Sequence, residues 1–364
     1  MNNNTSSRLL SLDFFRGFTM FLLIIEFTHL FNFLTAANFE GTFIYGLGTQ
    51  FHHHPWAGLR FWDLIQPFFM FIVGVAMPFS YANRIKKGDS HGAILKHILI
   101  RCFLLLFLGW WLFCQRLGII VFNFQNVLSQ LSVTILISFL IMRKPAWFQL
   151  AFSLALILGM EIIYRMFWVD GFNQPFVADK NFGAWFDLLI SGNLSKGHWV
   201  SINAISTTAH TIWGVLAGQL LMSSKTQKRK LITLILAGTI ALAIGYGLNP
   251  VTPIIKRIST SSFVFASGGW TLLALALSYY LIDVLKMRRG VKFFAIVGMN
   301  PLFIYLFAHM GGATMINSIL KPLPATFFGW AGEVWVGMIT ASLASFALWL
   351  ICYWLYKRKI FIKI

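Results

Sequence analysis

Long apolar runs recur from one end of this chain to the other, and they restrict its fold more than any other feature. A helix needs about 20 predominantly apolar residues to cross a bilayer, or somewhat more when it is tilted. The runs predict about ten spans, at 12–34, 63–83, 96–115, 126–142, 146–165, 203–224, 230–248, 261–283, 292–311 and 334–356. We therefore expect an all-α polytopic membrane protein of ten to eleven transmembrane helices, forming a single domain over 1–364.

The composition supports this class. The chain is 58% hydrophobic and 11% charged, whereas soluble proteins carry about 25% charged residues. A net charge of +18 would indicate nucleic acid as a partner of a soluble protein. Here the positive-inside bias of membrane proteins explains it better, so we expect lipid and no nucleic acid around the chain.

The basic residues fix the predicted orientation. If both termini are cytoplasmic, most of the 29 basic residues fall in inner loops, and each inner loop carries at least two. The inner set contains Arg8, Arg84, Lys86, Lys87, Lys96, Arg143, Lys144, Lys225, Lys228, Arg229, Lys230, Lys286, Arg288, Arg289, Lys292, Lys357, Arg358, Lys359 and Lys363. We expect a multi-pass membrane protein with both termini on the cytoplasmic side.

The histidines gather on the opposite side. In this topology all of the nine histidines except His91 and His97 fall at or near the outer face. His52, His53 and His54 precede Trp56 and Asp63, at the start of the second span. A carboxylate there either caps the helix or takes part in chemistry, because ionisable groups are costly at a membrane boundary. Together with the histidines and Trp56, Asp63 favours chemistry.

Glu26 and His29 form a second polar pair, three residues apart near the outer end of the first span. On a continuous helix they would share one face. Desolvation raises the pKa of a buried glutamate, which would suit proton transfer near neutral pH. The alternative is a polar pair that locks two helices together. Asp13 and Arg16 have the same spacing near the inner boundary, where we expect a structural ion pair or a pair that helps to hold an anion.

Three further segments carry polar residues. The loop 249–262 is basic although it lies outside, so Lys256 and Arg257 are expected to bind an anion or to pair with Glu26 or Asp63. The loop 166–202 is long, aromatic and outer, which favours a lid or a binding loop. In the ninth span Pro301 follows Asn300 and predicts a kink.

A stretch of small residues, GVLAGQLL at 214–221, indicates close helix packing.

A metal site is not expected. Neighbouring histidines in an extended stretch point to opposite faces, so at most His52 and His54 could converge. Zinc would need further ligands from elsewhere in the chain.

Several motifs resemble the heparan-alpha-glucosaminide N-acetyltransferase family, including its bacterial NagX-type members. The segment 8–17 resembles R-x-x-S-x-D-x-F-R-G, and 53–67 resembles H-x-x-W-x-G-x-x-x-x-D-L-x-x-P. Residues 253–263 and 298–301 resemble two further motifs of the family. The chain departs from the pattern near the end of the first span, where Glu26 and Phe27 replace an Asn found in many members, and at Gln130, which lacks the Arg that follows it in the family.

The resemblance implies transfer of acetyl from cytosolic acetyl-CoA to a glucosamine-type amine on the outer, periplasmic side. It places the catalytic histidine at His53, and we expect Asp63 or Glu26 to orient it. His29, Trp56, His309 and Lys256 are expected to bind an amino sugar or glycan acceptor. Arg84, Lys86, Lys87 and Arg101 are expected to hold the nucleotide phosphates of acetyl-CoA, with Gly74, Asn300 and Pro301 lining a channel for its arm.

Two other classes of function fit part of the pattern. A secondary transporter of a sugar or amino sugar would also use kinked helices and Glu/His pairs, although no inverted repeat is visible. A non-catalytic partner in envelope polysaccharide synthesis leaves the buried polar residues unexplained. The acetyltransferase interpretation leads, and it is compatible with a homodimer.

Overall fold

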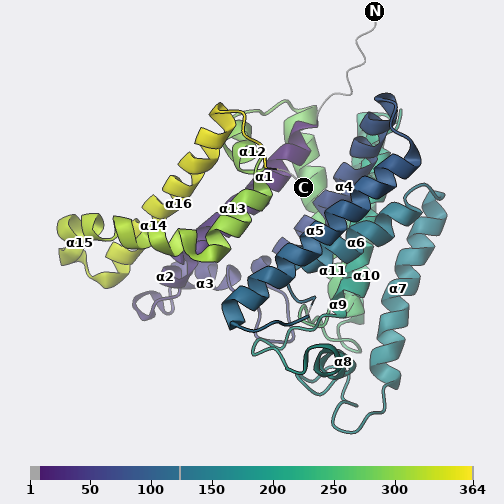
Figure 1. The fold of residues 1–364 in the computed structure, drawn as a ribbon, viewed down its shortest axis with the longest axis horizontal. Coiled ribbons are helices and arrows are strands. Elements are labelled where there is room, and N and C mark those ends of the chain that lie inside the picture. The colour runs from purple at the N-terminus through teal and green to yellow at the C-terminus, as the bar shows by residue number, and fades with distance from the viewer. Residues whose placement is uncertain (1–8, 123, 363–364) are drawn as a thin grey trace, which may run out of the picture. The chain divides into compact units, whose positions relative to one another are not determined.

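The structure is a computed structural model that describes residues 9–122 and 124–362, so Arg8 and Lys363 of the charge analysis lie outside the described residues. The named secondary-structure elements in the described part of the chain are all helices, joined by loops (Figure 1). Its extended pairing consists of one isolated antiparallel bridge between Ala57 and Ile255. The predicted all-α class is confirmed.

The contacts divide the chain into two compact units. The first contains Met1–His53, Arg60–Trp62 and Leu277–Lys363. Its helices are α1 (Leu10–Phe27), α2 (Leu30–Leu34), α3 (Phe43–Gln50), α12 (Val291–Val297), α13 (Pro301–Phe307), α14 (Ala313–Leu320), α15 (Pro322–Phe328) and α16 (Glu333–Lys357). Short 3₁₀ or π segments adjoin them at Ala37–Phe39, Tyr280–Val284, Ala308–Gly312 and Gly329–Ala331.

The second unit contains His54–Leu59 and Asp63–Ala276. A 3₁₀ turn, Phe61–Leu64, leads into its first long helix. The helices are α4 (Ile65–Lys86), α5 (His91–Leu117), α6 (Val127–Ile141), α7 (Ala146–Met166), α8 (Phe182–Ser191), α9 (Asn203–Met222), α10 (Gln227–Leu248) and α11 (Ser261–Tyr279), the last of which continues beyond Ala276 into the first unit.

Glycines bring α4 and α9 together in the second unit. A Cβ on Gly74 would lie 2.0 Å from the carbonyl oxygen of Thr211, and one on Gly214 would lie 2.2 Å from that of Phe71. Gly218 meets the Val75 carbonyl in the same way. The predicted close packing through the small residues of 214–221 is confirmed. Gly74 is therefore a packing residue between α4 and α9.

A break in the first unit replaces the expected ninth span. Helix α12 ends at Val297, and Pro301 is the first residue of α13, where a missing N–H costs least. The helical segment from Pro301 to Ala331 is the one long and apolar enough to cross a membrane. A span over 292–311 is therefore wrong in its boundaries, because the helix stops where Asn300 and Pro301 interrupt it.

Seven helices in the described part of the chain are long and apolar enough to cross a membrane. Six of them match expected spans, namely Phe61–Lys86, His91–Gln115, Ala146–Met166, Gln227–Leu248, Ser261–Val284 and Glu333–Lys357. The other expected spans are also helical, but α1 carries Asp13, Arg16 and Glu26, α6 has 15 residues, and α9 is rich in Ser, Thr and His.

Candidate functional site

Helix α1 ends earlier than predicted, and this separates Glu26 from His29. The helix stops at Phe27, and His29 has a left-handed backbone with φ 64° and an exposed side chain. The expectation that the two side chains share one helical face is therefore wrong. Glu26 Oε1 instead accepts a hydrogen bond of 3.0 Å from Trp62 Nε1. Within the first unit Glu26 is thus linked to the turn that precedes α4.

His52 and His53 also belong to the first unit. The Nε2 of His52 lies 3.2 Å from Thr35 Oγ1 and 3.3 Å from the Phe31 carbonyl oxygen, so this ring joins its own segment to α2. The backbone carbonyl of His53 accepts a hydrogen bond of 3.1 Å from Arg60 Nη1. Arg60 thereby holds the polypeptide at the residue predicted to be catalytic, while the ring of His52 has a structural role.

Asp63 and Lys256 form a buried ion pair in the second unit. Their side chains are 1% and 7% exposed, and Lys256 Nζ lies 3.8 Å from Asp63 Oδ1. The other carboxylate oxygen, Oδ2, accepts the backbone N–H of His54 at 3.2 Å. The basic loop 249–262 therefore pairs with Asp63, which was one of the two predicted partners.

Backbone contacts join the same two segments. Ala57 and Ile255 form the antiparallel bridge, and Gly58 donates its N–H to the Ile254 carbonyl at 2.7 Å. Gly58 has φ 147°, and a Cβ there would lie 2.5 Å from His54 Nε2, so only glycine fits under that ring. The Trp-containing segment 54–59 and the basic loop thus form one structural element, although about two hundred residues separate them.

Arg257 and Trp199 extend this element. The cationic groups of Lys256 and Arg257 lie 5.4 Å and 5.6 Å from the centre of the Trp199 ring, within the range of cation–π attraction. Burial lowers the pKa of Arg257, and the charge of Asp63 acts in the opposite direction. The two basic side chains and the carboxylate therefore form one electrostatic group in the second unit.

Trp56 is anchored to the loop 166–202. Its Nε1 donates to the Phe176 carbonyl at 2.7 Å, and its ring meets His198 edge to face at 6.1 Å. His198 Nδ1 is 2.6 Å from Asp179 Oδ2. Both His198 and Asp179 have left-handed backbones, with φ 58° and 59°. The loop is thus folded against the segment 54–59.

Asp187 on α8 ties the same loop to other parts of the second unit. The carboxylate accepts the backbone N–H of Ser201 at 3.0 Å and Gln125 Nε2 at 2.8 Å. Its side chain is buried, and this burial raises the pKa of Asp187, while the two donors act to lower it. Asp187 lies outside the long apolar helices, so its titration should be visible in the stability of the loop.

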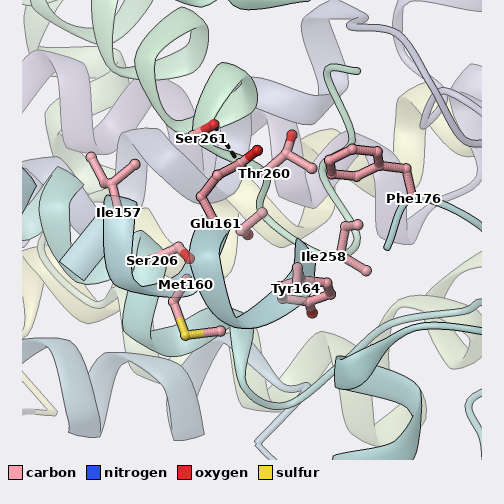
Figure 2. A pocket seen from close by; sticks show the side chains of 10 residues that line it. Ile157, Met160, Glu161, Tyr164, Phe176, Ser206, Ile258, Thr260 and Ser261 are labelled. Carbon is pink, nitrogen blue, oxygen red and sulfur yellow. Dashed lines mark hydrogen bonds between the residues drawn. The ribbon is translucent and has the colours of Figure 1, made fainter. Parts of the chain in front are cut away.

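Glu161 on α7 is a half-buried carboxylate that the sequence analysis missed. Its oxygens accept hydrogen bonds from Arg165 Nε at 2.7 Å, Thr252 Oγ1 at 2.7 Å and Ser261 Oγ at 2.8 Å. Figure 2 shows Glu161 pointing toward Ser261 beside a small cavity lined by further hydroxyl groups. The volume of this cavity is about 10 Å³, enough for one water molecule. The i, i+4 spacing of Glu161 and Arg165 in an apolar helix was the signal available in the sequence.

The residues predicted to bind phosphate lie around the end of α4. Arg84 Nη1 is 3.5 Å from Asp89 Oδ2 in the turn before α5, while the side chains of Lys86 and Lys87 are exposed. Arg101 is on α5 and is half-buried. The two lysines are therefore the most accessible positive charges of this set.

Asn300 and His309 occupy different environments in the first unit. The amide of Asn300 is fully buried, donates to the Ile360 carbonyl at 2.9 Å and accepts the Ile362 N–H at 2.8 Å. It therefore fastens the segment after α16. The exposed His309 packs against Phe27 and Tyr305, with ring centres 4.7 Å and 4.4 Å away.

Within residues 9–122 and 124–362, no group of three or more His, Cys, Asp or Glu side chains is arranged to hold a metal ion. The three cysteines, Cys102, Cys114 and Cys352, are free, and two of them are buried.

Comparison with known proteins gives two distant relatives and no matching family model. The chain is similar to heparan-alpha-glucosaminide N-acetyltransferase of Homo sapiens, with 23% identity over 436 residues that cover 98% of this chain and 60% of the human protein. The Mus musculus protein of the same name is 23% identical over 432 residues, which cover 99% of this chain and 61% of the mouse protein. The chain thus spans less than two thirds of these curated relatives. The similarity supports the family indicated by the motifs, at the level of an N-acetyltransferase family.

Proposed function

We propose that the protein is a multi-pass acetyltransferase of the bacterial inner membrane, with about ten spans and both termini in the cytoplasm. It takes acetyl from cytosolic acetyl-CoA and transfers it to the amine of an amino sugar or glycan on the periplasmic side. The distant similarity to the two N-acetyltransferases supports the reaction class. The seven long apolar helices and the charge distribution support the membrane topology.

One observation carries the proposal. Two motifs that resemble the family, at 53–67 and 253–263, are joined by the Ala57–Ile255 bridge and the buried Asp63–Lys256 pair. Buried ion pairs require a compensating reason because desolvation of both charges is costly. A site that must bind a protonated amine and then accept its proton supplies that reason.

The chemistry assigned to the chain is as follows. The amine nitrogen attacks the acetyl carbonyl carbon, a C–N bond forms, and the C–S bond of the thioester breaks. CoA leaves as the thiolate. His53 accepts the proton released by the amine, and Asp63 or Glu26 orients the imidazole. Direct transfer and transfer through an acetylated His53 differ in whether acetyl remains on the protein when no acceptor is present.

The proposed binding groups are those that the motifs and the charge pattern of the sequence indicated. Trp56, His29, His309 and Lys256 contact the amino sugar. Arg84, Lys86, Lys87 and Arg101 bind the phosphates of acetyl-CoA, and Asn300 positions its arm. The exposure of Lys86 and Lys87 supports this assignment, because accessible ammonium groups can pair with phosphate oxygens.

The test is acetyl transfer by the purified protein from radiolabelled acetyl-CoA to a panel of amino sugars that includes glucosamine. Labelled N-acetyl product supports the proposal. If no acceptor is labelled, but reconstituted vesicles accumulate labelled glucosamine, the proposal is wrong and the protein is a transporter.

A further inference from the structure

Three amide side chains form a directed chain of hydrogen bonds in the second unit. Gln66 on α4 donates its Nε2 to Oε1 of Gln130 on α6. Gln130 donates its Nε2 to Oδ1 of Asn203, at the start of α9, over 2.5 Å. Asn203 then donates its Nδ2 to the backbone carbonyl of Arg257 over 3.4 Å. Gln130 and Asn203 are each 1% exposed, whereas Gln66 is half-exposed.

The carbonyl at the end of this chain fixes its direction. A carbonyl oxygen can only accept, so the NH₂ group of Asn203 must face Arg257. The oxygen of Asn203 must then face the NH₂ of Gln130, and the oxygen of Gln130 must face the NH₂ of Gln66. Reversing any one amide would place two donors or two acceptors together in a buried position, which is costly. Gln66 therefore has its amide nitrogen engaged and its Oε1 available as an acceptor.

The chain closes on the buried ion pair. Asp63 lies in the 3₁₀ turn that leads into α4, three residues before Gln66, so the two residues are near neighbours at the start of this helical segment. The neighbour of Arg257 is Lys256, which lies 3.8 Å from Asp63. Contacts thus run from Asp63 along α4 to Gln66, through Gln130 and Asn203 to the basic loop, and back to Asp63. All of these residues belong to the second unit.

We infer that Gln66 is a specificity-determining residue, and that its Oε1 accepts a hydrogen bond from an N–H or O–H group of the amino sugar. Gln130 and Asn203 are positioning residues that act through it. The acceptor oxygen of Gln66 suits a ligand rich in amine and hydroxyl donors. This inference rests on the proposed function. The arm of acetyl-CoA also contains amide N–H groups, and the experiment separates the two sources.

The experiment compares Gln66→Leu, Gln130→Leu and the double variant in the acetyl-transfer assay with glucosamine. Leucine has a similar volume and no hydrogen-bonding group. Loss of one substrate hydrogen bond should raise the KM for glucosamine about three- to tenfold, with the KM for acetyl-CoA unchanged. Gln130→Leu should also raise the KM for glucosamine, because it frees the Gln66 amide to rotate. If Gln130 acts only through Gln66, the double variant should match Gln66→Leu.

Gln219→Leu is the matched control. Gln219 donates to the Met142 carbonyl at 2.7 Å, far along α9 from Asn203. Its replacement should lower the melting temperature without changing the KM for glucosamine. The inference is overturned if Gln66→Leu leaves that KM unchanged, if it raises the KM for acetyl-CoA instead, or if the two single effects multiply in the double variant.

A binding measurement keeps this inference separate from the proposed function. Glucosamine alone, without acetyl-CoA, should raise the melting temperature of the purified wild-type protein by mass action, and raise it less for Gln66→Leu. This holds even if no acetyl transfer is detected, a result that would count against the proposed function only. Equal shifts for the two proteins, or no shift for the wild type, would overturn the inference.

Discussion

Replacing Lys256 by Met removes the cation beside Asp63 and keeps a side chain of similar length. Asp63 is 1% exposed and Lys256 is 6% exposed, so water cannot easily take the place of the ammonium group. The variant therefore leaves a buried carboxylate that retains the N–H of His54 and the more distant charge of Arg257. Either the ionised Asp63 becomes less stable or it takes up a proton.

The expected loss is about 3 kcal/mol in the free energy of unfolding. Breaking a buried pair by removing one partner costs about 3–5 kcal/mol. The lower end applies here because the atoms are 3.8 Å apart and Arg257 also acts on Asp63. For a unit of this size each kcal/mol shifts the melting temperature by about 2–4 °C. We therefore expect Lys256→Met to melt about 6–12 °C below the wild type.

The assay is thermal unfolding of the detergent-purified protein for a double-mutant cycle. The cycle contains Lys256→Met, Asp63→Asn and the double variant, with the exposed Lys228→Met as a control. The double variant removes both charges, so its loss should be smaller than the sum of the single losses by at least about 1 kcal/mol. Lys228→Met should stay within about 0.5 kcal/mol of the wild type.

Two results would refute this reasoning. A Lys256→Met protein that melts within about 2 °C of the wild type would show that Asp63 does not depend on the ammonium group. Additive losses in the cycle would show that the two side chains act independently.

Three further predictions concern the loop 166–202, the donor site and the topology. The raised pKa of Asp187 favours its protonated form in the folded state, so the contribution of Asp187 to stability should be greatest below the ordinary pKa of 3.8 and should fall as the pH rises through the folded value. The melting temperature of Asp187→Asn, relative to that of the wild type, should therefore increase with pH. A difference that stays constant with pH would contradict this prediction. Acetyl-CoA should raise the melting temperature, and replacing Lys86 and Lys87 by Gln should reduce that rise, whereas an unchanged rise would exclude these lysines from the site. In intact cells a cysteine at position 196 should react with an impermeant thiol reagent and one at 228 should not, and the reverse labelling would invert the proposed topology.

Much of the helical framework could be predicted from periodicity and length, because helices that face lipid must be long and apolar. The ion pair between Asp13 and Arg16 could also be predicted, from their spacing of three residues, and Arg16 Nη2 lies 3.0 Å from Asp13 Oδ1. The Lys256–Asp63 pair could be named because a basic loop on the wrong side of the charge rule needs a compensating partner.

Helix ends were less predictable. The apolar character of 12–34 continues past Phe27, yet the backbone turns at His29, whose left-handed conformation no sequence signal marked. The break at Asn300 also lies inside an apolar stretch, where Pro301 predicted a kink but not that one helix ends and another begins. Hydropathy indicates whether a segment prefers lipid or water, whereas the position of a helix end depends on the contacts that satisfy its free carbonyl and N–H groups.

The spacing of residues in the sequence could not predict the hydrogen-bonded chain of amides or the group of hydrogen bonds around Glu161. Gln66, Gln130 and Asn203 come from three separate helices, and their hydrogen bonds depend on which helices become neighbours. Glu161 is also bound by Thr252 and Ser261, about a hundred residues further along the chain. Such clusters are defined by tertiary packing, so a single sequence shows only their individual members.

The most direct test of the proposed function is the rate of acetyl transfer by His53→Ala. The rate should fall about 10²-fold or more, the usual contribution of a general base, while the melting temperature stays near that of the wild type. His52→Ala is the matched control, since its ring bonds to Thr35 and Phe31 within the first unit, and it should lose much less activity. Near-wild-type turnover by His53→Ala would contradict the assignment of His53 as the base.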